Sequence, residues 1–493
     1  MWYAIPAILA FSLARKIFVS SKLTGVADIF SPVSSRNFRV DVSGTKFSDV
    51  IGIDEAREEV KQYFQYLKSS RRFQNLGAHM PKGCLLTGEP GTGKTLIAKA
   101  IASEAGVPFF SANGSDFCEI YGGSGSRRVR ELFQQAREVM PSVIFIDEID
   151  ALGSRYTTKN TGGSGEENRT MNQLLSEIDG VSQSTSDKIL IFAATNIKNA
   201  LDPALLREGR FDRKVHIDLP DHCARTELFN HFLQKHKQSV LNDTCEKLAN
   251  LTPGISPAAI STIVNEASIM SSEKMDSSIK FETLVNAIED ITLGKKKDCQ
   301  EKAGNLEREA YYHAGKALVS WFLPLKNQMR GELLKLSIAT RGNTSGYCFR
   351  QGREAHEYDT DIKIFNEVCQ LLAGKIAEKT IFGNSITKNS VQDVRRASRL
   401  CLQGLLSFGF QAEMGRVSTN YNDIGHGQIF ISSSARRQEE SELRANEVLS
   451  QAAHISAHIL RTRSCYLKKL VSELLKRKEL SHADLTRVLG KRH

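Results

Sequence analysis

Residues 88–95 read Gly-Glu-Pro-Gly-Thr-Gly-Lys-Thr and match the pattern GxxxxGK(S/T). An apolar run, Cys84–Thr87, precedes this segment and a helical run, Leu96–Ala105, follows it, as the pattern requires. Glycines let backbone N–H groups wrap the phosphates of a nucleotide, and the following helix adds its positive N-terminus. The lysine is expected to reach the β- and γ-phosphates, and the threonine hydroxyl to bind Mg²⁺. The residues predicted to hold ATP and Mg²⁺ are Gly88, Glu89, Pro90, Gly91, Thr92, Gly93, Lys94 and Thr95.

Further apolar runs recur along the first half of the chain. They lie at 107–110, 142–146 and 189–194. Helical stretches separate them, which is typical of a parallel sheet covered by helices on both faces. After Asp221 the pattern becomes helical, and from Asn305 it stays helical apart from a strand-like insert near 333–349. The sequence therefore predicts an α/β P-loop core followed by mostly helical domains.

Two acids end the apolar run Val143–Ile146. Asp147 at the end of this strand can hold Mg²⁺ through water, together with Thr95. Glu148 can orient and polarise the water that attacks the γ-phosphate. A strand exit with solvated acids is the alternative, and the phosphate-binding segment upstream disfavours it.

Polar side chains also follow the next apolar strand. Asn196 can reach the γ-phosphate or its water. Arg210 and Arg213 lie in a short, exposed-looking loop, and an arginine supplied to another subunit's site can stabilise charge on the transferred phosphoryl group. A salt-bridged surface cluster is the alternative for these arginines. The predicted catalytic residues are Glu148, Asp147, Asn196, Arg210 and Arg213.

Composition excludes several classes of protein. The chain has 493 residues, enough for roughly two to four domains. Hydrophobic residues make up 41% and charged residues 25%, which argues against disordered, collagen-like and multi-span membrane chains. The net charge of +10 is mild, and no zinc finger, RNA-recognition signature or basic–aromatic interleaving indicates nucleic acid. The nine cysteines form no CxxC pair, which favours a reducing compartment.

The N-terminus departs from this soluble composition. Residues 1–14 carry no charge, and with Ile17–Val19 the apolar stretch approaches the ~20 residues that span a bilayer. The basic pair Arg15 and Lys16 would lie at one interface. Residues 1–22 are therefore predicted to be a membrane anchor, with a cleaved mitochondrial presequence or a signal peptide as alternatives. The basic flank places the large domains in the cytosol or an equivalent compartment, such as a mitochondrial matrix.

These motifs together resemble those of AAA ATPases, as does the segment Phe47–Ala56. Two flanking segments narrow the resemblance, Gly106–Phe117 (GVPFFSANGSDF) and Met171–Gly180 (MNQLLSEIDG). They are similar to the membrane-anchored FtsH-type AAA metalloproteases, and most of all to the mitochondrial members, over nearly the whole chain. The resemblance implies a hexameric ring in which Arg210 and Arg213 act on the ATP of the neighbouring subunit.

The resemblance also places the nucleotide base. It implies that the base lies near Val50–Gly52, so Ile51 and Gly52 are candidate contacts. One departure from the family lies in the predicted lid, where Ser256-Pro-Ala-Ala259 stands in place of the usual Ser-Gly-Ala followed by an acid.

A loop that grips substrate is a further implication. The family lines the channel of its ring with an aromatic residue and a glycine, and this chain reads Phe117-Cys-Glu-Ile-Tyr121-Gly-Gly123. Tyr121, with Gly123, would grip unfolded polypeptide through the sequence-tolerant contact area of its ring. Gly122 stands where the family usually has valine. An ordinary buried tyrosine is the alternative.

The zinc site of the family is degenerate here. The family uses His-Glu-x-x-His, in which two histidines on one helix face bind Zn²⁺, the glutamate acts as base and a distant aspartate completes the ligands. Tyr312 and Lys316 occupy the histidine positions, His313 occupies the glutamate position, and Asp393 matches the third ligand. Lysine is a cation that repels Zn²⁺ and tyrosine is a poor ligand, so we expect no catalytic zinc. The pair His454 and His458 has i,i+4 spacing but is read as two histidines on a helix face.

The predicted organisation has five parts. They are a membrane anchor or presequence at 1–22, a linker at 23–45, an AAA+ ATPase α/β domain at 46–221, a helical lid at 222–296 and a peptidase-like helical domain at 305–493.

The predicted function is that of an ATP-driven protein unfoldase or translocase with an inactive peptidase domain, acting in membrane-associated protein quality control. Its partners would be unfolded or membrane polypeptides and the related subunits of a homo- or hetero-hexamer, with no nucleic acid. The mitochondrial inner membrane, with the ATPase facing the matrix, is the predicted location, and another organelle or a bacterial-type membrane stays open. An active ATP-dependent zinc metalloendopeptidase and a structural subunit of such a complex are the alternatives.

Overall fold

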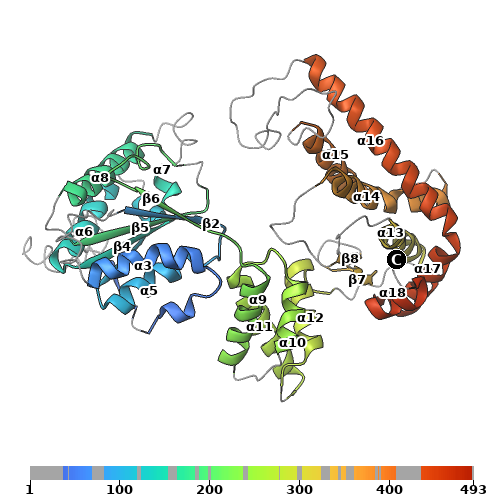
Figure 1. Cartoon of the computed structure of the whole chain (residues 1–493), viewed down its shortest axis with the longest axis horizontal. Coiled ribbons are helices and arrows are strands. Elements are labelled where there is room, and N and C mark those ends of the chain that lie inside the picture. The colour runs from blue at the N-terminus through green and yellow to red at the C-terminus, as the bar shows by residue number, and fades with distance from the viewer. Residues whose placement is uncertain are drawn as a thin grey trace, which may run out of the picture. The chain divides into compact units, whose positions relative to one another are not determined.

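The computed structural model of the chain describes residues 37–42, 44–68, 83–118, 124–153, 164–183, 188–197, 201–236, 242–276, 278–296, 303–323, 333–341, 346–350, 360–383, 387, 390–406 and 435–490. The chain forms two compact units, Met1–Asp218 and Leu219–His493 (Figure 1). The predicted anchor and residues 23–36 of the predicted linker lie outside the described residues. Within the described ranges, no helix combines the length and the apolar character needed to cross a membrane.

The described strands of the first unit form one sheet in the order β1-β3-β4-β5-β2-β6. Neighbouring strands from β3 to β6 are parallel, and β1 pairs antiparallel with β3 at the edge. Their bounds are β1 Arg39–Val40, β2 Gly83–Gly88, β3 Phe109–Asn113, β4 Ser142–Asp147, β5 Ile189–Thr195 and β6 Arg213–Ile217. The prediction of a parallel α/β core is confirmed.

Helices cover both faces of this sheet (Figure 1). Along β4, Ile144 and Ile146 join one apolar cluster with α6 and α8, whereas Val143 and Phe145 join the other cluster with α3 and α5. This alternation is the period of two that a strand imposes on its side chains. The helices are α3 Asp54–Lys68, α5 Lys94–Ala105, α6 Ser124–Glu138, α7 Asp150–Gly153 and α8 Ser164–Gln183, with short 3-10 turns at Phe47–Asp49 and Gly114–Phe117.

Two short strands differ from the sequence prediction. Arg39–Val40 lies in the predicted linker but pairs with Phe109 and Phe110, and the side chain of Phe38 is buried in the core. Residues 39–40 of the predicted linker therefore belong to the sheet. Strand β6 contains Arg213, which was predicted to lie in a loop. Strands of two to five residues carry too few positions for a hydrophobic pattern to reveal them.

The second unit begins with the predicted lid, which consists of helices. Asp221 caps the first of them by accepting a hydrogen bond of 2.7 Å from the N–H of Ala224. Ser256 caps the third, and Pro257 suits its first turn because no N–H is needed there. The helices are α9 His222–Lys235, α10 Asn242–Leu251, α11 Pro257–Glu273 and α12 Phe281–Leu293.

The C-terminal domain follows in the same unit. Its described strands form an antiparallel sheet in the order β8-β7-β9, which confirms the predicted strand-like insert. One apolar cluster joins this sheet to the surrounding helices. The elements are α13 Ala303–Phe322, β7 Leu333–Ser337, β8 Tyr347–Arg350, α14 Asp361–Phe382, α15 Val391–Leu406, α16 Ala435–Thr462, α17 Ser464–Arg477, β9 Glu479–Ser481 and α18 His482–Leu489.

Helices α13 and α14 approach each other closely because small residues face each other. A Cβ atom added to Gly315 would overlap the Cβ of Ala377 and lie 3.2 Å from the carbonyl oxygen of Ala373. The ring of Tyr312 lies against Gly374, where an added Cβ would be 2.5 Å from the ring. These contacts constrain where the middle turns of α13 can place their side chains.

We expect the substitution Gly315→Ala to lower the free energy of unfolding of the second unit by about 1–3 kcal/mol, because the added methyl group meets backbone and Cβ atoms that cannot rotate away. Urea unfolding of the full chain measures this change. Gly180→Ala on α8 is the matched control, since its added Cβ would lie 3.7 Å from the nearest atom and only the gain of about 1 kcal/mol in helix propensity remains. Equal free energies of unfolding for the two variants would show that α13 and α14 leave room for the added methyl group at position 315.

Candidate functional site

Neighbouring parallel strands of the first unit end at one edge of the sheet. The order β4-β5-β2 places their carboxyl ends side by side. β2 leads into the loop after Gly88, β4 ends at Asp147, and Asn196 follows β5. The structure thus brings together the phosphate-binding segment, the acids and Asn196, which the sequence predicted separately.

Lys94 lies at the centre of this edge. Its Nζ donates hydrogen bonds to the carbonyl oxygens of Gly88 and Glu89 at 2.9 and 2.7 Å. A third bond of 2.8 Å reaches Oδ1 of Asn196. Burial lowers the pKa of Lys94, and the nearby carboxylates of Asp147 and Asp150 oppose this shift. Acceptors from two strand ends therefore hold the ammonium group in one position.

The loop before Lys94 has the backbone that phosphate binding needs. Gly91 and Gly93 have φ values of 80° and 103°, which residues with a Cβ atom rarely adopt. The Thr92 hydroxyl donates to the carbonyl oxygen of Glu89 at 2.9 Å and braces the turn. Helix α5 begins directly after the loop, so its free N–H groups point toward an anion bound there.

Thr95 and Asp147 form the pair predicted to hold Mg²⁺. The Thr95 hydroxyl donates to Oδ2 of Asp147 at 3.0 Å. Hydroxyl and carboxylate oxygens are ligands that Mg²⁺ accepts, usually beside water and phosphate oxygens. The two side chains therefore fit the ion in chemistry and in mutual position.

Glu148 is held by its neighbours. Its backbone has a φ of 49°, an uncommon value for a residue with a side chain, and its N–H donates to Oδ1 of Asp147 at 3.0 Å. Its Oε2 accepts a bond of 3.2 Å from Nδ2 of Asn113. Asn113 ends β3 and lies opposite Asp147 in the sheet. Sequence reasoning missed Asn113, because only the strand order shows that β3 lies beside β4.

A second missed pair supports Asn196. The Thr195 hydroxyl donates to Oδ1 of Asp150 at 2.8 Å and accepts from the N–H of Ile197 at 3.0 Å. Asn196 lies in the chain between Thr195, which carries this hydroxyl, and Ile197, which donates to it. The turn after β5 is therefore tied to the segment after β4, and this fixes where the amide of Asn196 points.

The two arginines are less exposed than the sequence suggested. Arg210 makes a bidentate ion pair with Asp179 on α8 at 2.8 and 2.9 Å and donates to the carbonyl oxygen of Ala204 at 2.7 Å. The hydrogen bond from Arg210 holds the pKa of Asp179 below its usual value. Only 18% of the Arg210 side chain is exposed, and Phe211 next to it is buried in the core.

Arg213 lies at the start of β6 and faces helix α3. Its guanidinium donates to Oε1 of Gln62 at 2.8 Å and lies 5.9 Å from the ring centre of Tyr63. Both arginines are thus oriented by partners in their own chain. Those partners, Asp179 and Gln62, were not predicted.

Of the two remaining predicted regions, the structure describes the one expected near the nucleotide base and not the one expected to grip substrate. Ile51 and Gly52 lie between the first 3-10 turn and α3, next to the buried Val50. Tyr121 and Gly123 lie outside the described residues.

The three residues predicted to occupy zinc-ligand positions come together in the second unit. Tyr312 and Lys316 lie one turn apart on α13, and Asp393 lies in the first turn of α15. The Lys316 Nζ donates to Oδ2 of Asp393 at 2.7 Å, and the Tyr312 hydroxyl donates to the same oxygen. Both partners of this ion pair are largely buried, with 17% and 20% of their side chains exposed. The carboxylate of Asp393 thus accepts hydrogen bonds from both of the other side chains.

Their surroundings favour the protonated phenol. Burial and the negative charge of Asp393 raise the pKa of Tyr312 far above its usual value, so the hydroxyl stays a donor. His313 is buried beside this cluster, and an added Cβ on Gly346 would lie 2.7 Å from its imidazole. In the part of the chain that the structure describes, no three His, Cys, Asp or Glu side chains gather as a metal site. His454 and His458 are exposed on α16.

Comparison with known proteins gives two family matches. Residues 84–219 match the ATPase family associated with various cellular activities (AAA), and residues 301–488 match peptidase family M41. The chain is 36% identical to the ATP-dependent zinc metalloprotease FtsH of Rhodothermus marinus, over 99% of this chain and 70% of that protein. It is 36% identical to a mitochondrial inner membrane m-AAA protease component of Mus musculus, over 91% of this chain and 56% of that protein. The chain thus spans about half to seven tenths of the length of these relatives.

We expect Thr195→Val to lower the kcat of ATP hydrolysis about tenfold with little change in KM, because losing the hydroxyl frees the turn that carries Asn196. Thr195→Ser keeps the hydroxyl and should stay within about twofold of the wild-type rate. Steady-state hydrolysis measured against ATP concentration separates kcat from KM. A valine variant with the wild-type kcat would exclude a positioning role for Thr195.

Proposed function

Because the chain belongs to the FtsH-type family of AAA proteases, we propose that it is an ATP-driven protein unfoldase whose peptidase-like domain does not cleave its substrates. Its AAA domain makes it an AAA ATPase. The threaded polypeptide would be released unfolded, or passed to catalytic subunits in a mixed ring. One of the relatives is named as a zinc metalloprotease, so an active zinc metallopeptidase is the alternative against which this proposal is tested.

The contact of Lys316 and Tyr312 with Asp393 carries the second half of this proposal. Zinc ligands must offer lone pairs, as neutral imidazole and carboxylate do. Lys316 and Tyr312 offer hydrogen atoms instead, and both are bound to Oδ2 of the carboxylate that remains. A Zn²⁺ ion would have to displace the lysine and overcome its positive charge. The site favours a metal-free state by this chemistry.

In the proposed ATPase cycle, each residue of the first unit has a role. Lys94 would bind the β- and γ-phosphates. Thr95 and Asp147 would hold Mg²⁺, which would neutralise phosphate charge. Glu148 orients and polarises the attacking water, with Asn113 fixing its carboxylate. Asn196 senses the γ-phosphate from the end of β5. Ile51 and Gly52 would contact the base.

Assembly into a hexameric ring would complete the site. Arg210 and Arg213 would stabilise the transferred phosphoryl group in the neighbouring subunit. The bidentate bond to Asp179 leaves N–H groups of Arg210 available while fixing the plane of the guanidinium. Tyr121, followed by Gly123, would grip the polypeptide in the channel.

A membrane location completes the proposal. Residues 1–22 would anchor the ring, and the mouse relative is named as a mitochondrial inner membrane component. The proposed setting is therefore the quality control of membrane-associated proteins at that membrane, with the ATPase in the matrix. The substrates would be unfolded or membrane polypeptides.

Glu148→Gln should lower ATP turnover at least about 100-fold while ATP binding persists, because the neutral amide cannot polarise water. Glu138→Gln, at the exposed end of α6, is the matched control and should leave turnover unchanged. Turnover and nucleotide binding are measured on the same purified ring. Unchanged turnover in Glu148→Gln would favour a structural subunit over a motor.

Zinc content tests the loss of peptidase activity. The wild-type ring should hold far less than one zinc ion per chain, whereas the triple variant Tyr312→His, His313→Glu, Lys316→His should bind about one. Adding Asp393→Asn to the triple variant should weaken this binding, since it removes the third ligand. Metal analysis and cleavage of an unfolded substrate are read on the same samples. Stoichiometric zinc with cleavage in the wild type would overturn the proposal.

A further inference from the structure

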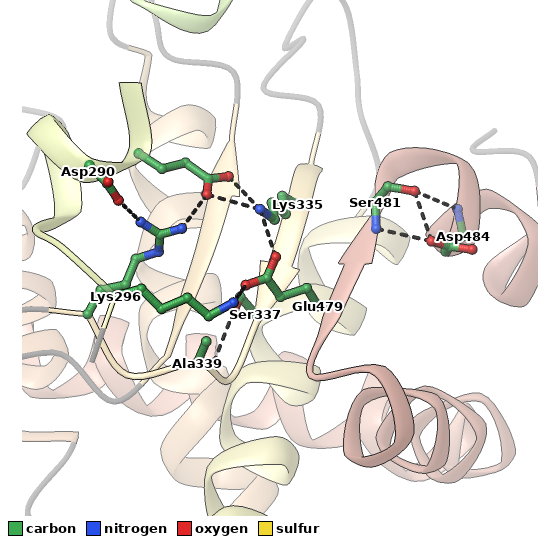
Figure 2. A network of polar contacts seen from close by, with 10 residues as sticks. Asp290, Lys296, Lys335, Ser337, Ala339, Glu479, Ser481 and Asp484 are labelled. Carbon is green, nitrogen blue, oxygen red and sulfur yellow. Dashed lines mark hydrogen bonds and ion pairs between the residues drawn. The ribbon is translucent and has the colours of Figure 1, made fainter. Parts of the chain in front are cut away.

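A network of charged side chains joins the predicted lid to the C-terminal sheet (Figure 2). Glu289 near the end of α12 has a fully buried side chain. Its carboxylate contacts Nζ of Lys335 on β7 at 2.8 Å and Nη2 of Arg341 at 2.8 Å. Asp290 pairs with Nη1 of the same arginine. One helix of the lid thus presents two consecutive carboxylates to two cations of the other domain.

The network continues to the third strand of the sheet. Lys335 also pairs with Glu479 on β9 at 3.0 Å, and Lys296 after α12 reaches the same carboxylate at 2.9 Å. Lys296 forms a backbone bridge with Arg341 as well. Figure 2 shows Lys335 lying between the lid and Glu479. We call these six residues the lid–sheet network: Glu289, Asp290, Lys296, Lys335, Arg341 and Glu479.

The three acidic side chains of this network are matched in number by its three basic side chains, so their formal charges cancel. Burial alone would raise the pKa of Glu479, but the hydrogen bonds from Lys296 and Lys335 hold it below the usual value. Only 4% of the Arg341 side chain is exposed, and the guanidinium lies 5.8 Å from the ring centre of Tyr347. Separating the lid from the sheet would leave buried charges without partners, which costs far more than breaking a surface ion pair. Buried pairs are also screened little by salt.

We infer that the lid–sheet network makes the lid and the C-terminal domain move as one body. A rotation of the lid during the ATPase cycle would then be carried into the C-terminal domain through α12 and β7, and not only through the chain that connects them. This inference deepens the proposed function, because it assigns the route by which ATP hydrolysis acts on the domain that receives substrate.

The test compares two lid acids of similar exposure in the full chain. Asp290→Asn removes the negative charge of an ion pair between the lid and the sheet domain, whereas Asp276→Asn removes that of an ion pair with Lys280 inside the lid. Glu289→Gln is the stronger variant, and Asp290→Asn keeps the test valid if that variant fails to fold. Hydrogen exchange of α12 and β7 is measured with ADP and with a non-hydrolysable ATP analogue. ATP turnover and substrate unfolding are measured in parallel.

In the wild type we expect the nucleotide analogue to change exchange in α12 and β7 together. Asp290→Asn and Glu289→Gln should speed exchange in both elements about tenfold, lower the substrate unfolded per ATP about tenfold, and keep ATP turnover within about twofold. Asp276→Asn should behave as wild type. Wild-type exchange and coupling in Glu289→Gln, or nucleotide effects confined to α12, would overturn the inference. A wild-type ring that unfolds no substrate would refute the proposed function, while the exchange data would still test the network.

Discussion

The geometry of the candidate ATP site depends on how one side chain is held. Lys94 donates hydrogen bonds to two carbonyl oxygens of its own loop and to the side-chain amide oxygen of Asn196. Thr95, the next residue, reaches Asp147 at the end of β4. Two consecutive residues at the start of one helix thus reach the ends of three strands. This is possible only because β4, β5 and β2 are adjacent and parallel, so the sheet order is a condition for the chemistry.

The second unit follows a related rule, that a charge removed from water needs a partner. Lys316, at a position where the sequence resemblance implies a zinc ligand, is neutralised by Asp393. Glu289 is neutralised by Lys335 and Arg341. The first pair lies between helices of one domain, and the second group lies between two domains. In both places ion pairs hold together elements that are far apart in the sequence.

Much of the first unit could be predicted from the sequence, because its signals lie within short contiguous segments. The glycine-rich loop after β2 and the two acids at the end of β4 are examples. Supporting residues were missed for one reason. Asn113, Asp179 and the Thr195–Asp150 pair act across strands and helices whose adjacency only the fold reveals. The bonds from Tyr312 and Lys316 to Asp393 depend likewise on α14, which packs against both α13 and α15.

The full burial of Glu289 has a consequence for how this chain can be inherited. Recombination that exchanged the lid alone would bring a foreign α12 against Lys335 and Arg341, and a helix without the two acids would leave both cations unmatched. The junction between lid and C-terminal domain is therefore a poor crossover point, although it separates two domains in sequence. Lineages should pass these two domains on as a pair, with compensating charge changes on both sides where the network varies.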